Sequence, residues 1–244
     1  MSDAEALVQS LEDTSAASAA VIVPLLLELV GPRSVVDYGC GIGAWLAELR
    51  SCGIDDVLGV DTHDPGAQLL IPRDRFRVTD LEHLTRSVGQ ADLALCLEVA
   101  EHLDASAAAP LVRALAGSAP VVAFSAAIPF QRGIHHTNLQ WPGYWRELFA
   151  ASGYRQLDVL RRRIWDDERV AFWYRQNLFL YASDEWLRAH PLDDRGEALP
   201  EHIVHPGLLR ENDRIALDRQ GISALVRELP RAARRSLGRR RPGP

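Results

Sequence analysis

The segment Val-Val-Asp-Tyr-Gly-Cys-Gly-Ile-Gly-Ala at residues 35–44 joins a short apolar run to a glycine-rich turn. Glycine lets the backbone pass close to a ligand, and a helix that begins after such a turn directs its N-terminal amide groups toward polar ligand atoms. The spacing of Gly39, Gly41 and Ala44 also satisfies the G-x-G-x-x-A pattern of dinucleotide-binding proteins. The segment therefore predicts a strand, a turn and a helix beside a nucleotide-like ligand.

Short apolar runs recur after this segment, each followed by a turn or a helix-like stretch. Including the one that precedes the glycines, they lie at residues 34–38, 56–60, 76–79, 91–97 and 121–126. This rhythm is typical of a parallel sheet covered by helices, and right-handed crossovers make the predicted α/β fold doubly wound. A helix is expected at 4–30. Two late strands, 154–165 and 170–182, are expected to be antiparallel because only the acidic turn 166–168 joins them.

The composition narrows the possible chemistry. The chain has 244 residues, of which 47% are hydrophobic, enough for one large domain. All 27 basic residues are arginine, which excludes Schiff-base lysines, Walker-type phosphate lysines and the active-site lysines of dehydrogenases. The three cysteines form no C-x-x-C pair, and a reducing cytoplasm suits them best.

Charge and hydropathy bear on the partners. Residues 1–230 hold 21 arginines against 33 acidic residues, a formal charge of −12, and the remaining six arginines lie in the acid-free tail. Such an acidic body favours a small-molecule partner over nucleic acid. The apolar run 19–30 contains Pro24 and Glu28 and follows an acidic N-terminus. We therefore expect neither secretion nor a membrane span. We expect the protein to be cytoplasmic.

Aspartates at the ends of the first three predicted strands suit one particular ligand. A carboxylate at Asp37, two residues before the first glycine, would repel a pyrophosphate but attract a ligand with an amino group and a sulfonium, as in S-adenosylmethionine. Asp61 can accept both ribose hydroxyls, with Thr62 beside it, and Asp80 can accept the adenine amino group while Leu81 packs on the ring. The alternative is that these aspartates only cap the helices that follow.

Here the chain resembles the class I S-adenosylmethionine-dependent methyltransferases. The resemblance rests on V-V-D-Y-G-C-G-I-G at 35–43, G-V-D at 59–61, V-T-D-L at 78–81 and L-C-L-E-V-A-E-H-L at 95–103. It implies a seven-stranded, mostly parallel sheet with an antiparallel last strand, direct methyl transfer, and cofactor contacts at Gly39, Gly41 and Glu98. We expect a methyltransferase domain at 1–182 and a C-terminal helical extension with an arginine-rich tail at 183–244.

A second group of residues follows the fourth predicted strand. The spacing of Glu98, Glu101 and His102 predicts that they share one helical face and can ligate a divalent metal. The pattern resembles the metal motif of ubiquinone-pathway and small-RNA 2′-O-methyltransferases, although metal-free relatives carry it too. Either His135 or His136 can complete the site, and we assign His136. Without a metal, the two histidines become the candidate general bases, with Glu98 beside them.

The loop that carries these histidines predicts the acceptor site. Asn138, Trp141 and Tyr144 add hydrogen-bonding groups and aromatic faces to His135 and His136, a combination typical of sugar binding. The loop and the Y-R-Q-N sequence at 174–177 are similar to methyltransferases of glycan, aminoglycoside and other natural-product pathways. The arginines at 161–163 are expected on a solvated strand face, and the aromatic residues at 165 and 172–174 on the hairpin strands.

Three classes of function remain after this reading. The first is a methyltransferase that acts on a hydroxyl or amine of a small polar acceptor, such as a sugar or an aminoglycoside-like natural product. The second is a metal-dependent RNA 2′-O-methyltransferase, which the Glu-Glu-His cluster and arginine tail favour and the acidic body opposes. The third is a non-catalytic S-adenosylmethionine-binding protein, which the intact set of aspartates and glycines argues against.

Overall fold

The computed structural model describes residues 3–133, 135–192 and 198–215. Contacts divide the chain into two units, residues 1–205 and 206–244. The described part of the second unit, residues 206–215, is helical, and the arginine-rich tail lies outside the described residues. The predicted domain boundary after residue 182 falls inside the first unit and stays a prediction.

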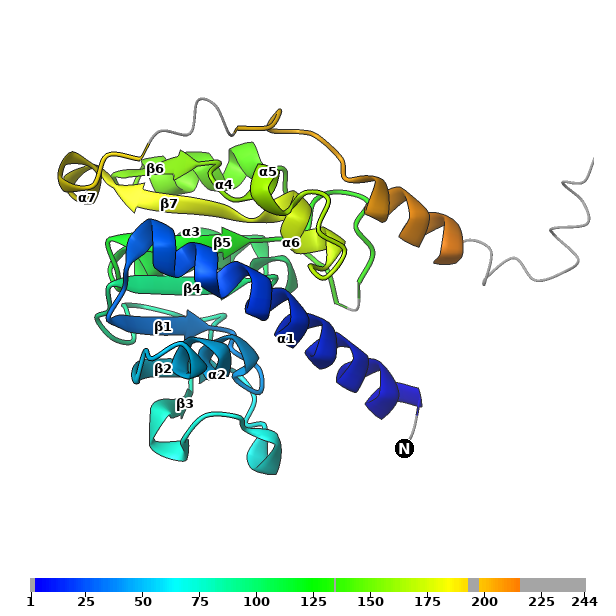
Figure 1. The fold of residues 1–244 in the computed structure, drawn as a ribbon, viewed down its shortest axis with the longest axis horizontal. Helices are drawn as coiled ribbons and strands as arrows, with labels where there is room; N and C mark the ends of the chain where they lie inside the picture. Colours follow the sequence, from blue (N-terminus) through cyan, green and yellow to red (C-terminus); the bar gives the residue numbers. More distant parts are fainter. Residues whose placement is uncertain (1–2, 134, 193–197, 216–244) are drawn as a thin grey trace, which may run out of the picture. The chain divides into compact units, whose positions relative to one another are not determined.

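A seven-stranded sheet forms the centre of the first unit, with strand order β3-β2-β1-β4-β5-β7-β6 (Figure 1). The strands are β1 (Ser34–Tyr38), β2 (Asp56–Asp61), β3 (Phe76–Val78), β4 (Leu93–Leu97), β5 (Val121–Ser125), β6 (Tyr154–Leu157) and β7 (Phe179–Ser183). β1 to β5 are parallel, whereas β7 is antiparallel to both β5 and β6. The predicted doubly wound sheet with an antiparallel last strand is therefore confirmed.

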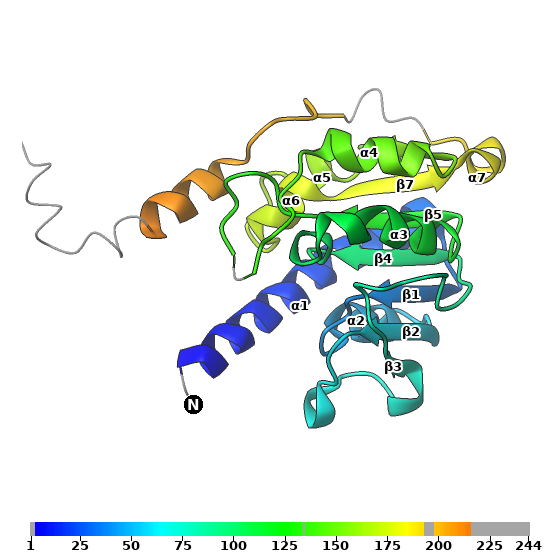
Figure 2. The same ribbon diagram turned by 180° about the vertical axis from the view of Figure 1, so that it is seen from behind.

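Helices cover both faces of this sheet. They are α1 (Asp3–Val30), α2 (Ala44–Ser51), α3 (Ala105–Ala116), α4 (Pro142–Ala150), α5 (Arg161–Ile164), α6 (Phe172–Asn177) and α7 (Asp184–Ala189), with short 3-10 helices at η1 (Gly66–Gln68), η2 (Arg73–Arg75) and η3 (Ala100–His102). Figure 1 shows α1 and α2 on one face, and Figure 2 shows α3 and α4 on the other. Residues 79–92 connect β3 to β4 without a helix.

Alternation along the strands divides the core into two layers. Val35 packs with the residues of α1 and α2, whereas Val36, its neighbour in β1, packs with those of α3. The same alternation separates Val121 from Val122 in β5. Because both faces of these strands are buried, their sequences are continuous apolar runs without a polar face.

The apolar character of α1 has its own explanation. Residues 13–30 are long and apolar enough to cross a membrane by length and composition, and 28% of this window is buried inside the protein. Ala19, Ile22, Val23 and Leu26 follow a helical spacing and are fully buried. Packing on the core accounts for these residues, and the expected absence of a membrane span stays a prediction.

The predicted hairpin at 154–182 was wrong in its connection, although the pairing of β6 with β7 is antiparallel as predicted. After the four residues of β6 the chain forms α5 and α6 before it enters β7. Arg161 is 1% exposed and not on a solvated strand face. Its guanidinium donates to Asp158 at 2.9 Å and lies 4.2 Å from the centroid of the Phe179 ring. The aromatic residues at 172–174 belong to α6 and not to a strand.

The segment 198–205 is attached to the same region of the first unit. Arg161 donates hydrogen bonds to the carbonyls of Leu199 and Pro200, at 3.2 and 3.4 Å. Arg146 of α4 forms an ion pair with Glu201. Arg161 also donates to the carbonyl of Gln176 at 3.3 Å, so this buried arginine binds a carboxylate and three carbonyls, and it ties a late segment of the chain to α5.

Candidate active site

The glycine turn after β1 is built around the close approach of another segment. Gly39 has φ +78°, and its amide donates to the carbonyl of Val60 at 2.8 Å. A Cβ atom at Gly39 would lie 2.4 Å from a methyl carbon of Val99. Gly41 has φ +55° with open space where a Cβ would lie. Only glycine therefore satisfies both the backbone conformation and the space at position 39.

A cavity of about 450 Å³ lies along the carboxyl ends of the strands, within the size range of small-molecule sites. Its walls include Gly39, Asp61, Thr62, Leu81, Glu98 and His135. These residues follow β1, β2, β3, β4 and β5, so the cavity crosses the point where the strand order reverses. With His102, which also lines this cavity, seven of the predicted site residues thus meet in one place.

Two predicted cofactor aspartates lie near the glycine turn, of which Asp61 lines the cavity and Asp37 does not. The Asp61 carboxylate accepts from the amides of Gly41 and His63, each at 2.9 Å, which orients it at the cavity. Asp37 is 3% exposed. Burial raises the pKa of Asp37 to about 7, and the nearby Asp61 carboxylate adds to the rise. Thr62 accepts from the amide of Leu81 at 3.4 Å, which ties the ends of β2 and β3 together.

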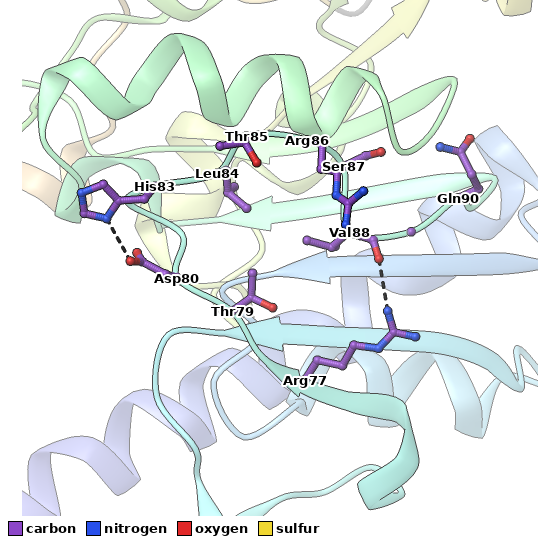
Figure 3. A pocket seen from close by; sticks show the side chains of 11 residues that line it. Arg77, Thr79, Asp80, His83, Leu84, Thr85, Arg86, Ser87, Val88 and Gln90 are labelled. Carbon is purple, nitrogen blue, oxygen red and sulfur yellow. Dashed lines mark hydrogen bonds and ion pairs between the residues drawn. The ribbon is translucent and has the colours of Figure 1, made fainter.

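Asp80 lies apart from this group. Its carboxylate pairs with His83 at 2.9 Å, and this hydrogen bond lowers the pKa of Asp80. Figure 3 shows both side chains at the rim of a different cavity, of about 630 Å³, under the helix-free connection 79–92. The structure therefore brings Leu81 to the cofactor cavity but directs the Asp80 carboxylate to His83, and adenine recognition by Asp80 stays a prediction.

Glu98 adopts an unusual backbone conformation directly after β4. Its φ is +55°, so the predicted helical face shared by Glu98, Glu101 and His102 was wrong: the latter two belong to the 3-10 helix η3. The Glu98 carboxylate accepts from Gln131 Nε2 at 2.8 Å and Asn177 Nδ2 at 3.2 Å. Burial raises the pKa of Glu98, and these two hydrogen bonds oppose the rise.

Glu101, His102 and His136 form a compact cluster, with one potential ligand atom from each within 4.8 Å of the others. Both carboxylate oxygens of Glu101 are buried, and neither finds a hydrogen-bond partner among the described residues. Burial raises the pKa of Glu101 well above its usual value, and the Glu98 charge raises it further. A buried carboxylate beside two imidazoles is a donor set that fits a divalent cation.

The loop after β5 holds the two histidines differently. His136 directs Nδ1 at the carbonyl of Gln131, 3.0 Å away, and a Cβ at Gly133 would lie 2.1 Å from its Nε2. His135 has φ +57° and lines the cofactor cavity. The loop leaves β5, the neighbour of β4, as predicted.

The other predicted acceptor residues do not line the cofactor cavity. Asn138 is 2% exposed, and its backbone N–H donates to the carbonyl of Glu101. The Trp141 ring lies 5.3 Å from that of His202, and the Tyr144 ring lies 5.0 Å from that of Trp145. Their assignment to the acceptor stays a prediction.

Two residues that donate hydrogen bonds to Glu98 were not predicted from the sequence. Gln131 lies 33 residues from Glu98 and Asn177 lies 79 residues from it, so no local pattern connects them. The Y-R-Q-N sequence at 174–177 contained a signal, because two adjacent amide side chains in a buried segment need partners. The partner itself required the fold.

Comparison with known proteins identifies the family. A family model described as a methyltransferase domain matches residues 11–155, more than half of the chain. The chain belongs to the class I S-adenosylmethionine-dependent methyltransferases. No curated protein matches the sequence of this methyltransferase.

Several solved structures share the fold of this methyltransferase at low sequence identity. The sugar N-methyltransferase KedS8 from a Streptoalloteichus species has a TM-score of 0.54 and 17% identity, over 68% of this chain and 87% of that chain. DesVI from Streptomyces venezuelae has a TM-score of 0.54 and 15% identity, over 70% and 92% of the two chains. The methyltransferase domain of bacterial CtHen1 has a TM-score of 0.51 and 19% identity, over 68% and 97%.

The residues present fit S-adenosylmethionine, the cofactor of this family. The turn at Gly39 and Gly41 has the conformation and space for close backbone approach. The carboxylates of Asp61 and Glu98 line the same cavity. The order of the strand ends places Leu81 and Asp61 at one end of the cavity and Glu98 at the other. An adenosine group suits the end with Leu81 and Asp61, and a cationic group suits the end with Glu98.

Proposed function

We propose that this methyltransferase transfers a methyl group to a hydroxyl or amine of a small polar acceptor, a sugar or an aminoglycoside-like compound. The observation that carries the proposal is the buried, unpartnered Glu101 carboxylate beside His102 and His136. His102 also lines the cofactor cavity. A group that takes a proton from the acceptor, or a cation that polarises it, is therefore available next to the methyl donor.

On the cofactor side, Asp61 would hold the ribose hydroxyls, Leu81 would pack on the adenine, and Glu98 would face the methionine end. When bound, S-adenosylmethionine supplies an electrophilic methyl group on a sulfonium centre. The protein would orient the acceptor in line with that carbon and exclude water. This positioning would raise the rate of methyl transfer through proximity and orientation, without a covalent intermediate.

On the acceptor side, we propose that Glu101, His102 and His136 hold a divalent cation. The mixed oxygen and nitrogen set suits Mg, Mn, Fe or Zn better than Ca. Such a cation would orient the acceptor oxygens and lower the pKa of the attacking hydroxyl. The bond between His136 Nδ1 and the Gln131 carbonyl leaves Nε2 as the ligand atom. Glu98 is engaged by two amides and is the least suited of the four predicted ligands.

Without a cation, His135 or His136 would be the general base. His135 lines the cofactor cavity. Chelation separates the two mechanisms: a metal-dependent enzyme loses activity with a chelator and regains it with added Mn²⁺ or Mg²⁺. Full activity after exhaustive chelation, with loss of activity in His135→Ala or His136→Ala, would assign the histidines as bases. The matched control is His190→Ala, because His190 is exposed and lies outside the cluster.

The acceptor class rests on charge and on analogy. The acidic body disfavours a polyanionic acceptor, and the structurally similar KedS8 is a sugar N-methyltransferase. An RNA 2′-O-methyltransferase is the second candidate, because the carboxylate and imidazole cluster resembles the motif of small-RNA enzymes and the CtHen1 domain shares the fold. The three free cysteines support a cytoplasmic location.

Transfer of a labelled methyl group from S-adenosylmethionine to panels of aminoglycosides, simple glycosides and short RNA decides the acceptor. We expect transfer to a glycoside or aminoglycoside, and loss of at least a hundredfold in kcat for Glu101→Gln, about 2.7 kcal/mol of transition-state stabilisation. Transfer to RNA alone would overturn the small-molecule proposal. Cofactor binding without transfer to any panel would favour the non-catalytic alternative.

A further inference from the structure

Backbone strain is concentrated at the carboxyl edge of the sheet. In the described residues, three residues other than glycine have a positive φ: Glu98 (55°), Phe130 (75°) and His135 (57°). Such conformations cost energy and persist where the surrounding structure holds them, commonly at functional sites. Glu98 and His135 line the cofactor cavity, which leaves Phe130 to be explained.

Phe130 occupies a turn that brings its neighbour inward. The amide of Gln131 donates to the carbonyl of Ile128 at 3.0 Å, with Pro129 and Phe130 between them. Phe130 thus stands at the turn position that normally requires glycine. Phe130 is 76% exposed whereas Gln131 is 5% exposed. The strain at Phe130 accompanies the burial of an amide side chain against the Glu98 carboxylate.

A chain of amides determines which way Gln131 faces. The backbone N–H of His205 can only donate, and it donates to Gln176 Oε1 at 2.8 Å. Gln176 must therefore present Nε2 to Asn177 Oδ1, 3.0 Å away. Asn177 then presents Nδ2 to Gln131 Oε1 at 3.0 Å and to Glu98. Gln131 is left with Nε2 toward Glu98, at 2.8 Å. Every amide in this chain has one orientation, and the carboxylate receives donors at both oxygens.

Gln131 also contacts the acceptor side of the site through its main chain. Its carbonyl lies 3.0 Å from His136 Nδ1. A carbonyl only accepts, so Nδ1 carries a proton, and in the neutral form of the imidazole Nε2 is then the nitrogen without one. One residue therefore touches a cofactor-side carboxylate with its side chain and an acceptor-side histidine with its backbone.

We propose that Gln131 is a positioning residue that couples the two sides of the site. Its side chain, oriented by Asn177 and Gln176, aims the Glu98 carboxylate at the cofactor cavity, and its carbonyl fixes the His136 ring. This inference rests on the proposed function, since it takes Glu98 as a cofactor residue and His136 as an acceptor-side residue.

The test uses the full chain and two readouts that do not require the acceptor. Calorimetry measures the Kd for S-adenosylmethionine, and long-range ¹H–¹⁵N NMR reports the tautomer of His136. Gln131→Met keeps the shape and the main-chain carbonyl but removes the amide donor. We expect its Kd to rise about tenfold or more, because the carboxylate loses a donor in a buried site, while the Nδ1–H tautomer of His136 is retained.

The converse variant is Gly133→Ala. Its Cβ would displace the His136 ring, so we expect a change of the His136 signals with an unchanged Kd for the cofactor. Gln140→Met is the matched control, because Gln140 donates to Asn138 in the same loop; it should change neither readout. The double variant Glu98→Gln/Gln131→Glu exchanges the two side chains. Its unfolding temperature should be higher than that of either single variant, but its Kd for S-adenosylmethionine should stay above the wild-type value, because the negative charge has moved to position 131.

A purely structural role for Gln131 would give a different pattern. A wild-type Kd for S-adenosylmethionine in Gln131→Met would overturn the proposed coupling. It would also be overturned if Gln131→Met and Gly133→Ala each lost both the cofactor affinity and the His136 NMR signal. Failure of the wild-type chain to bind S-adenosylmethionine would instead overturn the proposed function itself.

Discussion

The two sides of the active site are built by different means. On the cofactor side, groups near in sequence form the contacts: Asp61 accepts from Gly41 and from His63, 20 and two residues away. At the far end of the same cavity, next to the acceptor side, the Glu98 carboxylate is held by amides 33 and 79 residues away. The contacts of Asp61 can be recognised from a nearly continuous stretch of sequence, whereas the contacts of Glu98 form only when the sheet has folded. A sequence motif therefore reveals the contacts at the glycine turn much more readily than the contacts at the end of the cavity that borders the acceptor side.

The largest effect is expected where the two sides touch. Gly39→Ala forces a Cβ to within 2.4 Å of Val99, at a residue with φ +78°, and should cost about 2–4 kcal/mol of unfolding free energy and most of the cofactor affinity. Gly53→Ala is the control, because it has φ +95° and open space around it. Chemical denaturation of both variants and of the double variant Gly39→Ala/Val99→Ala separates the steric clash with Val99 from backbone strain at residue 39. Equal losses in the two single variants would rule out the collision.

An intermediate effect is expected from Asp37, whose pKa is about 7 in the folded protein against 3.8 normally. Between pH 4 and 7 the folded state binds more protons than the unfolded state, so the unfolding free energy should fall as pH rises, by up to about 1.4 kcal/mol per pH unit. Affinity for the cationic cofactor should change in the opposite sense, rising about tenfold per unit up to pH 7.

Calorimetry across pH 5.5–8.5 checks this expectation. Glu98 and Glu101 lie in the same site and also have raised pKa values, so the difference between wild type and Asp37→Asn isolates the contribution of Asp37. A cofactor affinity with the same pH profile in both proteins would assign the dependence to the acceptor side.

The smallest effect is a gain. Phe130→Gly removes the strain at φ +75° and loses little packing, because the side chain is 76% exposed. We expect it to be about 1 kcal/mol more stable than Phe130→Ala, which keeps the strain, and its unfolding temperature to be about 2–4 °C higher. Thermal unfolding followed by circular dichroism measures the difference. Equal unfolding temperatures would mean that the turn is relaxed and that Gln131 needs no strain to reach Glu98.

The sequence predicted the parts of the fold that local physics determines. Strands β1, β4 and β5 are almost wholly buried and have mostly apolar sequences, and the glycine turn has backbone requirements that only a few residue types meet. The doubly wound parallel sheet followed from these, whereas its seven strands were implied by the resemblance to the class I methyltransferases, and the cofactor by the strand-end aspartates together with that resemblance. The meeting of Gly39, Asp61, Leu81 and Glu98 at one cavity followed too, because parallel strands end at the same edge.

The failures occurred where distant residues decide the local structure. Arg161 is tolerated in the core because it contacts the Asp158 carboxylate, three carbonyls and the Phe179 ring, and an isolated run of three arginines gives no sign of that. Residues 170–182 have a strand-like composition, yet the first part is the helix α6, which carries Asn177 to Glu98. The spacing of Glu98 and Glu101 suggested a helix because the left-handed conformation of Glu98 leaves no trace in the sequence.

The position of β7 between β5 and β6 constrains how the chain is made. Val121 of β5 pairs with Ala182 of β7, so β5 lacks a partner on that side until the ribosome has released the chain beyond residue 183. All five residues of β5 are buried in the finished sheet. During synthesis the unpaired edge of β5 is available for hydrogen bonding with strands of other nascent chains. Folding of the sheet is completed by its last strand, and a fragment cut short before residue 179 would be expected to aggregate.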